Sequence, residues 1–233
     1  VQFNPFNPNV LAACAAENFG ISGSGKVYVM DLANNNIVLK LCVATEDGAF
    51  DVAWCEINPA LLVVACGDGR VQLWNLSGAE PSMTEYCEGG GHEMYSAHWN
   101  LVTKDVFATG CWDHACKVWD PNRTASVRTY CEHAKEVYEV QWSPVRAEIF
   151  ASVSGDGCLK VWDVRCQQSL LTKKTNSMLL SCDWNKYDDN LIVTGAADNH
   201  VAVWDLRQLA HPSVLLPGHQ SAVRRVRCSP HHK

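Results

Sequence analysis

Two stretches of the sequence contain residue types at spacings that could hold a cofactor or a metal. Residues 20–27 approach the glycine-rich phosphate loop, in which a lysine and the hydroxyl after it bind phosphates and magnesium. Val27 replaces that hydroxyl, and a strand-like run follows instead of a phosphate-binding helix N-terminus. Cys111, His114 and Cys116 are zinc-ligand types, but a tight turn at His114 would put the cysteines on opposite strands, with no fourth ligand nearby. We therefore predict no cofactor, no metal site and no enzymatic activity.

The composition is that of an acidic globular chain. The 233 residues include 19 Lys and Arg against 25 Asp and Glu, for a formal charge of −6, and 47% are apolar. This balance argues against nucleic acid as a partner. No apolar run approaches the roughly 20 residues that cross a bilayer, so we expect no direct membrane insertion. Most of the twelve cysteines lie in apolar strand-like runs, where we expect the buried, reduced thiols of a cytoplasmic protein.

Tryptophans recur at a nearly constant period along the chain. A first set has steps of 45, 43 and 42 residues and consists of Trp54, Trp99, Trp142 and Trp184. A second set lies 20 residues further on each time and consists of Trp74, Trp119, Trp162 and Trp204. This period is that of a four-stranded propeller blade, although some helical repeats have overlapping lengths.

The local pattern distinguishes strands from helices. Each second-set tryptophan ends a β-branched run, and each such run follows a turn that contains Asp68, Asp113, Asp156 or Asp198. Turns of this kind between alternating apolar runs are hairpin signals, and no window has the spacing of an amphipathic helix. We predict an all-β fold with four strands per repeat. The approximate repeats are residues 1–46, 47–90, 91–132, 133–175 and 176–218, with a partial repeat at 219–233.

These residues resemble the WD-repeat family, which implies a WD40-type β-propeller. In that family a histidine, a strand Ser or Thr, the turn Asp and the second-set Trp are hydrogen-bonded inside each blade. Two repeats can supply all four members, namely His92, Thr109, Asp113 and Trp119, and His133, Ser152, Asp156 and Trp162. A third repeat lacks the histidine and supplies Thr194, Asp198 and Trp204. In the repeat of Trp74, Val64 stands at the hydroxyl position.

The repeats at the two ends are irregular. In the first repeat Phe3 and Met30 stand at the two tryptophan positions, 27 residues apart instead of 20, so we expect a long inner hairpin loop around residues 17–25. Residues 219–230 supply only the first strand of a sixth repeat. Because an open ring exposes strand edges, we expect a fragment of a seven-bladed propeller, with about five blades and one strand of a sixth.

The WD-repeat resemblance also implies which side chains surround the channel at the narrower face of the ring. They are the residues six and four before each first-set tryptophan, or before Cys228, which holds that position in the partial sixth repeat, and the residue before each turn Asp. With the neighbouring Asp51, the candidate peptide-binding residues are Phe50, Asp51, Glu93, Tyr95, Trp112, Glu136, Tyr138, Met178, Leu180 and Arg224. Rigid aromatics beside glutamates suit a peptide with an apolar face and one or two basic residues. The alternative is that the aromatic rings merely pack at the channel rim.

Several segments are similar to a narrower family, the peroxisomal import receptors for type-2 targeting signals, or peroxin seven family. The runs 181–187 and 223–226 are not general WD-repeat sequences, and residues 178–187, 191–196, 204–207 and 222–226 also match. This resemblance implies a receptor that binds the N-terminal signal of cargo proteins as an amphipathic helix. It also implies a co-receptor, delivery to the peroxisomal docking complex, and cycling between cytoplasm and peroxisome. Glu93, Glu136 and Asp51 would then face the basic residue of the signal.

Two other functions stay open at this point. Residues 162–165 and 204–207 match a short box that substrate adaptors of cullin-type ubiquitin ligases use, although many WD-repeat proteins carry it without that role. A histone-binding or scaffold-binding propeller is the second alternative.

Overall fold

The computed structural model describes residues 1–20, 23–33, 36–78, 80–88 and 90–231, and antiparallel strands dominate it. Within these ranges, twenty strands form five four-stranded sheets, and a short 3₁₀ segment, η1, covers Glu17–Gly20. The all-β prediction with four strands per repeat is confirmed. No helix among the described residues has the length and apolar character needed to cross a membrane.

Each sheet, called a blade below, pairs four consecutive strands in chain order. Blade 1 consists of β1 (Gln2–Phe3), β2 (Val10–Ala16), β3 (Gly25–Ala33) and β4 (Asn36–Thr45). Blade 2 consists of β5 (Ala49–Trp54), β6 (Leu61–Cys66), β7 (Arg70–Asn75) and β8 (Ser82–Cys87). Blade 3 consists of β9 (Met94–Trp99), β10 (Phe107–Cys111), β11 (Cys116–Trp119) and β12 (Arg128–Tyr130). Blade 4 consists of β13 (Val137–Trp142), β14 (Ile149–Ser154), β15 (Cys158–Asp163) and β16 (Ser169–Lys174). Blade 5 consists of β17 (Leu179–Trp184), β18 (Leu191–Ala196), β19 (Val201–Asp205) and β20 (Val214–Leu216).

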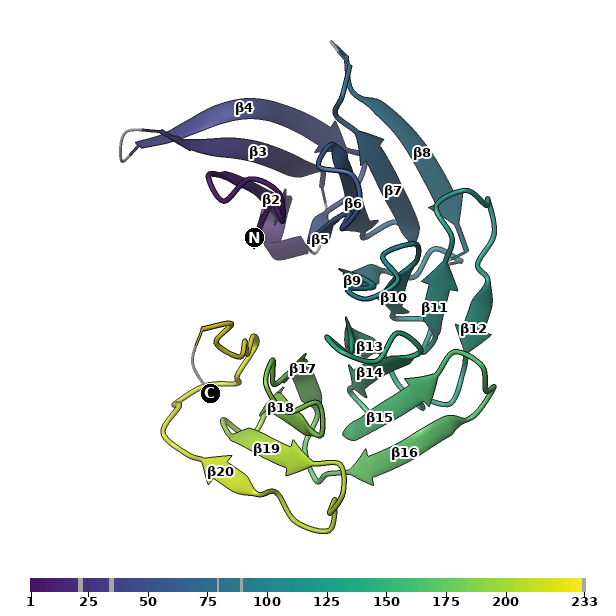
Figure 1. Cartoon of the computed structure of the whole chain (residues 1–233), viewed down its shortest axis with the longest axis vertical. Coiled ribbons are helices and arrows are strands. Elements are labelled where there is room, and N and C mark those ends of the chain that lie inside the picture. Colours follow the sequence, from purple (N-terminus) through teal and green to yellow (C-terminus); the bar gives the residue numbers. More distant parts are fainter. Residues whose placement is uncertain (21–22, 34–35, 79, 89, 232–233) are drawn as a thin grey trace.

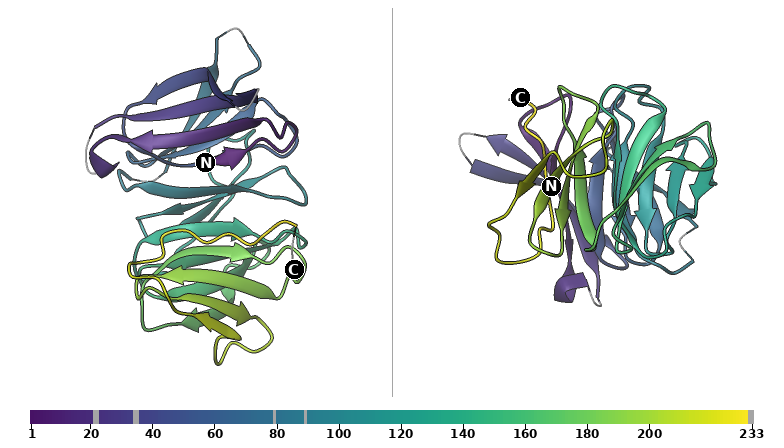
Figure 2. Two further views of the ribbon diagram at one scale, coloured as in Figure 1. Left: turned by 90° about the vertical axis from the view of Figure 1, so that its left-hand side faces the viewer. Right: turned by 90° about the horizontal axis from the view of Figure 1, so that it is seen from below.

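The five blades follow one another around an open arc, with the first strand of each blade on the inside (Figure 1). From the side, the sheets lie stacked in chain order (Figure 2). Segment 221–228 continues the inner edge beside β17. There the Ser181 hydroxyl accepts the Val226 amide at 2.9 Å, and the Asp183 carboxylate accepts the Cys228 amide at 2.8 Å. The architecture is therefore that of part of a β-propeller ring.

Aspartates close the hairpins that connect the second and third strands of blades 2 to 5. At each turn a carboxylate oxygen accepts the amide two residues further on, at 2.7 to 3.2 Å, from Asp68, Asp113, Asp156 and Asp198. The residue directly after the aspartate has a positive φ in all four turns: 83° at Gly69, 73° at His114, 76° at Gly157 and 70° at Asn199. Glycine adopts this conformation without steric cost, so the Asp-Gly pairs specify two of the turns directly.

The hydrophobic core lies between adjacent blades. Each of four clusters of buried side chains combines residues of two neighbouring blades. The side chains at most 1% exposed include those of Trp54, Trp99, Trp119, Trp142, Trp162 and Trp184. The tryptophan period in the sequence therefore reflects the repeated packing of one blade against the next. Phe3, which occupies a first-set position in blade 1, is 55% exposed.

Blade 4 contains the hydrogen-bonded chain that the WD-repeat pattern implies. The His133 ring lies 2.7 Å from the Ser152 hydroxyl and 3.1 Å from the Asp156 carboxylate, and the Trp162 indole donates to Ser152 at 2.8 Å. Burial of Asp156 opposes its ionisation, but hydrogen bonds from His133 and the Ala134 amide hold its pKa below the ordinary value. The network thus keeps a charged aspartate inside the blade.

Blade 3 departs from this expectation at the histidine. The Trp119 indole donates to Thr109 at 2.9 Å. The His92 side chain, however, is exposed, and among the described residues it bonds to neither Thr109 nor Asp113. Lys117, whose side chain is only 5% exposed, pairs with Asp113 at 2.6 Å instead. Lys117 on β11 therefore supplies the hydrogen-bond donor that His92 was expected to provide.

Blades 5 and 2 retain only part of the network. In blade 5 the Trp204 indole donates to Thr194 at 2.8 Å, while the half-exposed Asp198 lies 3.3 Å from the His200 ring. In blade 2, where Val64 offers no hydroxyl, the Trp74 indole donates to the side chain of Gln72 at 3.1 Å. In each of blades 2 to 5 the indole of the second-set tryptophan donates a hydrogen bond, whereas the partner of the turn aspartate varies.

Candidate functional site

Four inner strands carry a β-bulge at the same position. In β5, β9, β13 and β17 the pairing register shifts near the start of the strand, and this leaves one residue of each without a partner, namely Phe50, Tyr95, Tyr138 and Leu180. A bulge bends the strand and changes the direction of the extra side chain. These are the residues four before the first-set tryptophans. We call the end of the channel where they lie the bulge face.

The bulge face carries one continuous aromatic cluster, made of Phe50, Tyr95, Trp112 and Tyr138. The Tyr95 ring is central, with centroid distances of 5.1 Å to Phe50, 5.4 Å to Trp112 and 5.5 Å to Tyr138. Trp112 also meets Tyr138 edge to face at 5.9 Å. All four side chains stay partly exposed. The rings therefore pack on one another across three blades and still present apolar surface to a ligand.

Glu93 and Glu136 flank the aromatic cluster. Their carbonyl oxygens accept the amides of Trp112 and Gly155 at 2.9 and 3.0 Å. A Cβ atom at Gly155 would lie 3.1 Å from the Glu136 carboxylate and 3.2 Å from the Tyr138 ring, so these two groups are neighbours. Burial, and then the charge of Glu136, raises the pKa of Tyr138. Neither carboxylate forms an ion pair with any residue that the structure describes, so both remain available to a cationic ligand.

The remaining candidates of the bulge face come from blade 5 and segment 221–228. Met178 lies just before β17 and is 43% exposed, whereas Leu180, at the bulge of β17, is only 9% exposed. Met178 therefore offers the larger apolar surface. The exposed Arg224 acts on the pKa of Tyr138, lowering it against the larger opposite effect of burial. This interaction places a positive charge near the aromatic cluster.

Asp51 lies in the channel wall and not with the aromatic rings, contrary to the sequence-based expectation. Its side chain is 13% exposed, and one carboxylate oxygen lies 3.5 Å from the Arg225 guanidinium. The other oxygen accepts the Ala97 amide at 3.1 Å. Phe50 is the extra residue of the bulge and joins the aromatic cluster, whereas the next residue, Asp51, is paired again and faces the channel. Its charge already has a partner, which leaves Glu93 and Glu136 as the carboxylates of the bulge face.

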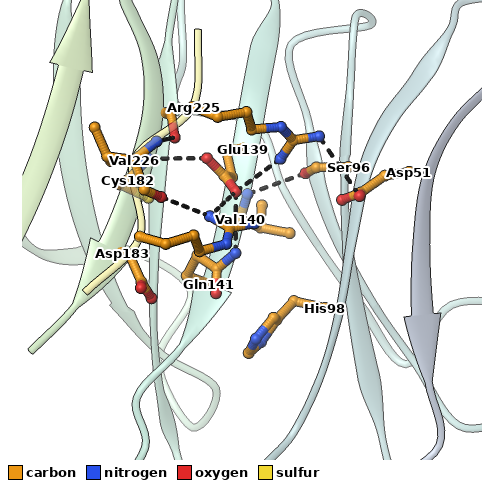
Figure 3. Close-up of polar contacts among 12 residues, drawn as sticks. Asp51, Ser96, His98, Glu139, Val140, Gln141, Cys182, Asp183, Arg225 and Val226 are labelled. Carbon is orange, nitrogen blue, oxygen red and sulfur yellow. Dashed lines mark hydrogen bonds and ion pairs between the residues drawn. The ribbon is translucent and has the colours of Figure 1, made fainter. Parts of the chain in front are cut away.

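The channel also contains charged groups that sequence reasoning missed (Figure 3). The Glu139 side chain is 0% exposed and accepts hydrogen bonds from the guanidinium groups of Arg225 at 2.9 Å and Arg227 at 2.7 Å. It also accepts the Cys182 amide at 2.9 Å. Glu139 lies three residues before Trp142, as Asp51 lies three residues before Trp54. This shared spacing is the sequence signal that could have identified Glu139 as a channel residue.

A cavity of about 530 Å³ lies along this channel and is lined in part by His98, Asp183 and Arg227. Burial, with the positive charges of Lys186 and Arg227, lowers the pKa of His98 to about 3. His98 is therefore neutral near neutral pH, and its Nδ1 accepts the Trp142 amide at 3.1 Å. The histidine holds neighbouring inner strands together and is not arranged as a proton-transfer group.

The two cofactor-like stretches have structural explanations. Residues 21 and 22 of the phosphate-loop-like stretch lie outside the described residues, while Lys26 lies in β3, as the strand-like pattern predicts. Cys111 ends β10, and Cys116 begins the paired strand β11. Burial raises the pKa of each of these thiols to about 12, so both are protonated near neutral pH. All twelve cysteines of the chain are free thiols.

Comparison with known proteins gives two kinds of match. The family model for the WD domain, G-beta repeat, matches residues 90–120, 124–163 and 165–205, from β9 to β19. The peroxisomal targeting signal 2 receptor of Saccharomyces cerevisiae is 29% identical, over 100% of this chain and 75% of that receptor. The receptor of the same name from Dictyostelium discoideum is 42% identical, over 54% of this chain and 40% of that receptor. Peroxisome biogenesis protein 7 of Arabidopsis thaliana is 39% identical, over 54% of this chain and 41% of that protein.

The matches differ in how much of each relative they cover. The alignments with the slime-mould and plant proteins span less than half of those proteins, while the yeast alignment runs along the whole of this chain. A receptor name and WD40 repeats agree with the prediction that this chain is not an enzyme, and the comparisons confirm it. Residues 90–120, 124–163 and 165–205 thus match WD40 repeats, the five sheets follow one another as blades of part of a β-propeller ring, and the sequence is similar to the peroxisomal targeting signal 2 receptors.

Proposed function

We propose that this protein is an import receptor that binds the N-terminal type-2 targeting signal of peroxisomal cargo proteins. The observation that carries the proposal is the partly exposed aromatic cluster of the bulge face, flanked by Glu93 and Glu136, whose carboxylates form no ion pair with the residues that the structure describes. Relatives named as peroxisomal targeting signal 2 receptors support this assignment over that of a general peptide-binding propeller.

The bulge face suits an amphipathic helix. The apolar stripe of the signal lies against Phe50, Tyr95, Trp112 and Tyr138, and Met178 extends this surface toward blade 5. The basic residue near the start of the signal faces Glu136 or Glu93. An ion pair at an exposed rim contributes only about 0–1 kcal/mol, so the aromatic contacts supply most of the affinity, and the carboxylates select the charge of the peptide.

The proposal includes the partners and the route of such a receptor. The loaded receptor works with a co-receptor, meets the docking complex at the peroxisomal membrane, and cycles between cytoplasm and peroxisome. Nucleic acid is not a partner, since the formal charge is −6 and the two face glutamates repel phosphates. Attachment to the membrane is through partners and not through direct insertion.

The relatives do not favour the alternative functions. The box at residues 162–165 that suggested a ubiquitin-ligase adaptor also has a structural explanation. The Arg165 guanidinium lies 2.6 Å from the Asp163 carboxylate of the same box, and Arg207 pairs in the same way with Asp205 at 2.7 Å. A box whose arginine closes a local turn needs no ligase partner to explain it.

Fluorescence anisotropy with a labelled type-2 signal peptide tests the proposal. The full-length protein should bind the peptide with micromolar or better affinity, with its co-receptor present if the receptor alone is too weak. A peptide whose leading Arg is changed to Asp serves as the matched control and should bind less tightly. Equal affinity for the two peptides, or no binding of either with the co-receptor present, would reject the assignment.

A further inference from the structure

The bulge face and the channel are connected residue by residue. Phe50 and Tyr138, which lie in the aromatic cluster, are followed directly by Asp51 and Glu139, which lie in the channel wall. In segment 221–228 the exposed Arg224 is likewise followed by Arg225. Because these pairs share a backbone in a densely packed inner strand, a shift of the channel side chain moves the neighbour that faces the ligand.

In four successive blades, the residue that faces the channel on the inner strand makes the same kind of hydrogen bond. The residue three before the first-set tryptophan accepts an amide of the next inner strand, at 2.9 to 3.1 Å. The acceptors are Asp51, Ser96, Glu139 and Ser181, and the donated amides are those of Ala97, Val140, Cys182 and Val226. These bonds already hold each blade to its neighbour.

Arg225 occupies the next position of this series, but a guanidinium can only donate. Its side chain turns back across the channel, 2.9 Å from the Glu139 carboxylate and 3.5 Å from that of Asp51, as Figure 3 shows. The bonded residues are 86 and 174 positions apart in sequence. We call Asp51, Glu139 and Arg225 the channel clasp. It joins blade 2, blade 4 and segment 221–228, which are not successive members of the arc.

The charges of the clasp are balanced by Arg227, which lies outside it. Glu139 is fully buried, and a buried carboxylate is tolerated only when cations and other donors satisfy it. Arg227 contributes a second guanidinium at 2.7 Å from the same Glu139 oxygen. Two carboxylates therefore meet two guanidinium groups in the channel. Adjacent blades are already joined by the hydrogen bonds to backbone amides described above. The contact of Arg225 with Asp51 instead connects segment 221–228 to blade 2 across the channel.

We propose that the channel clasp is a positioning device for the ligand-binding face. By tying Asp51 and Glu139 to Arg225, it holds the attached Phe50, Tyr138 and Arg224 at the separation that the bound peptide requires. Rings held in place before binding lose less freedom on binding, and this raises affinity. The proposal rests on the function proposed above, because it concerns the same face and the same ligand.

Asp51→Asn is the sharpest test of the clasp. The Asn side-chain oxygen can still accept the Ala97 amide, so only the charge that faces Arg225 is lost. Asp183→Asn is the matched control, since Asp183 is also buried on an inner strand, accepts the Cys228 amide at 2.8 Å and pairs with Lys186 at 2.7 Å. Both variants remove one carboxylate charge and leave a side-chain oxygen that can accept a backbone amide, although Asp183 also accepts the Trp184 amide at 2.9 Å.

The two variants should differ in peptide affinity. In anisotropy with the labelled signal peptide and the full-length protein, Asp51→Asn should raise Kd about 3- to 10-fold, and Asp183→Asn should leave Kd close to that of the wild type. Arg225→Gln should weaken binding by a similar factor. The double variant with Asp51→Asn should then be no weaker than the worse single variant, because Arg225→Gln already breaks the contact with Asp51 along with that with Glu139. Additive losses in the double variant would mean that the residues act separately and would overturn the clasp.

Hydrogen exchange provides a readout that needs no peptide. Asp51→Asn should speed amide exchange in segment 221–228 as well as in β5, whereas loss of a purely local contact would affect β5 and its pairing strands only. A wild-type protein that fails to bind the signal peptide refutes the proposed function. Wild-type binding with an unchanged Kd in Asp51→Asn, or unchanged exchange in segment 221–228, refutes the positioning role alone.

Discussion

Tyr95→Leu is the substitution that tests the aromatic cluster most severely, because the Tyr95 ring contacts three other rings at 5.1, 5.4 and 5.5 Å. Leucine keeps an apolar side chain at the bulge and removes the flat ring. Each aromatic pair contributes about 0.5–1.5 kcal/mol beyond its buried area, so with partly exposed rings the free energy of unfolding should fall by about 1–3 kcal/mol. A central aromatic of a binding site contributes about 1–2 kcal/mol to affinity, so Kd for the signal peptide should rise about 5- to 30-fold.

The assay combines peptide anisotropy with thermal unfolding of the same preparation. Tyr187→Leu is the matched control, because Tyr187 is 46% exposed and follows the opposite end of β17 from the bulge. It should leave Kd unchanged. A folded Tyr95→Leu variant with wild-type Kd would refute the role of the cluster, and so would an equal loss of affinity in Tyr187→Leu.

Three further predictions follow from individual contacts. Glu136→Lys should raise Kd for the signal peptide about fivefold and improve binding of the peptide whose leading Arg is changed to Asp, with little change in Tm. If the ratio of the Kd values for the two peptides is the same in the variant and in the wild type, this prediction is contradicted. The pKa of Asp156 lies below its ordinary value of 3.8 in the folded state, so the unfolded chain takes up the proton first and the free energy of unfolding should fall as pH drops through that value. Asp156→Asn should flatten this acid dependence in urea unfolding, and an equally steep dependence would speak against the assignment. Gly195→Ala would place a Cβ 2.8 Å from a methyl group and the carbonyl oxygen of Val223, so it should lower the free energy of unfolding by about 1–3 kcal/mol. An unaltered Tm would contradict this, because it would mean that segment 221–228 moves away from the added methyl group without loss of stability.

The blades could be predicted from sequence because their determinants are local and repeated. The tryptophan period marks the interblade packing, and the turn aspartates bond amides only two residues away, so both appear as short patterns. The positions of the bulge face followed from the same period. The bulges themselves did not, because a register shift between two strands leaves no distinctive residue type in either strand.

The individual roles of neighbouring residues were harder to predict. The sequence placed both Phe50 and Asp51 at the ligand, but the bulge puts Phe50 in the aromatic cluster while Asp51 lies in the channel wall. His92 had the right spacing for the network in blade 3, yet Lys117 bonds the aspartate there. The contact of Arg225 with Glu139 crosses 86 residues and depends on the curvature of the arc, which no local pattern encodes.

Photocrosslinking locates the bound peptide most directly. A type-2 signal peptide that carries a benzophenone at one apolar position is bound to the full-length protein and irradiated, and the crosslinked residues are identified by mass spectrometry. Binding at the bulge face predicts crosslinks to Phe50, Tyr95, Trp112 or Tyr138 that excess unlabelled peptide abolishes. Competed crosslinks found only on the outer strands, or only around Tyr187, would contradict binding at the aromatic cluster.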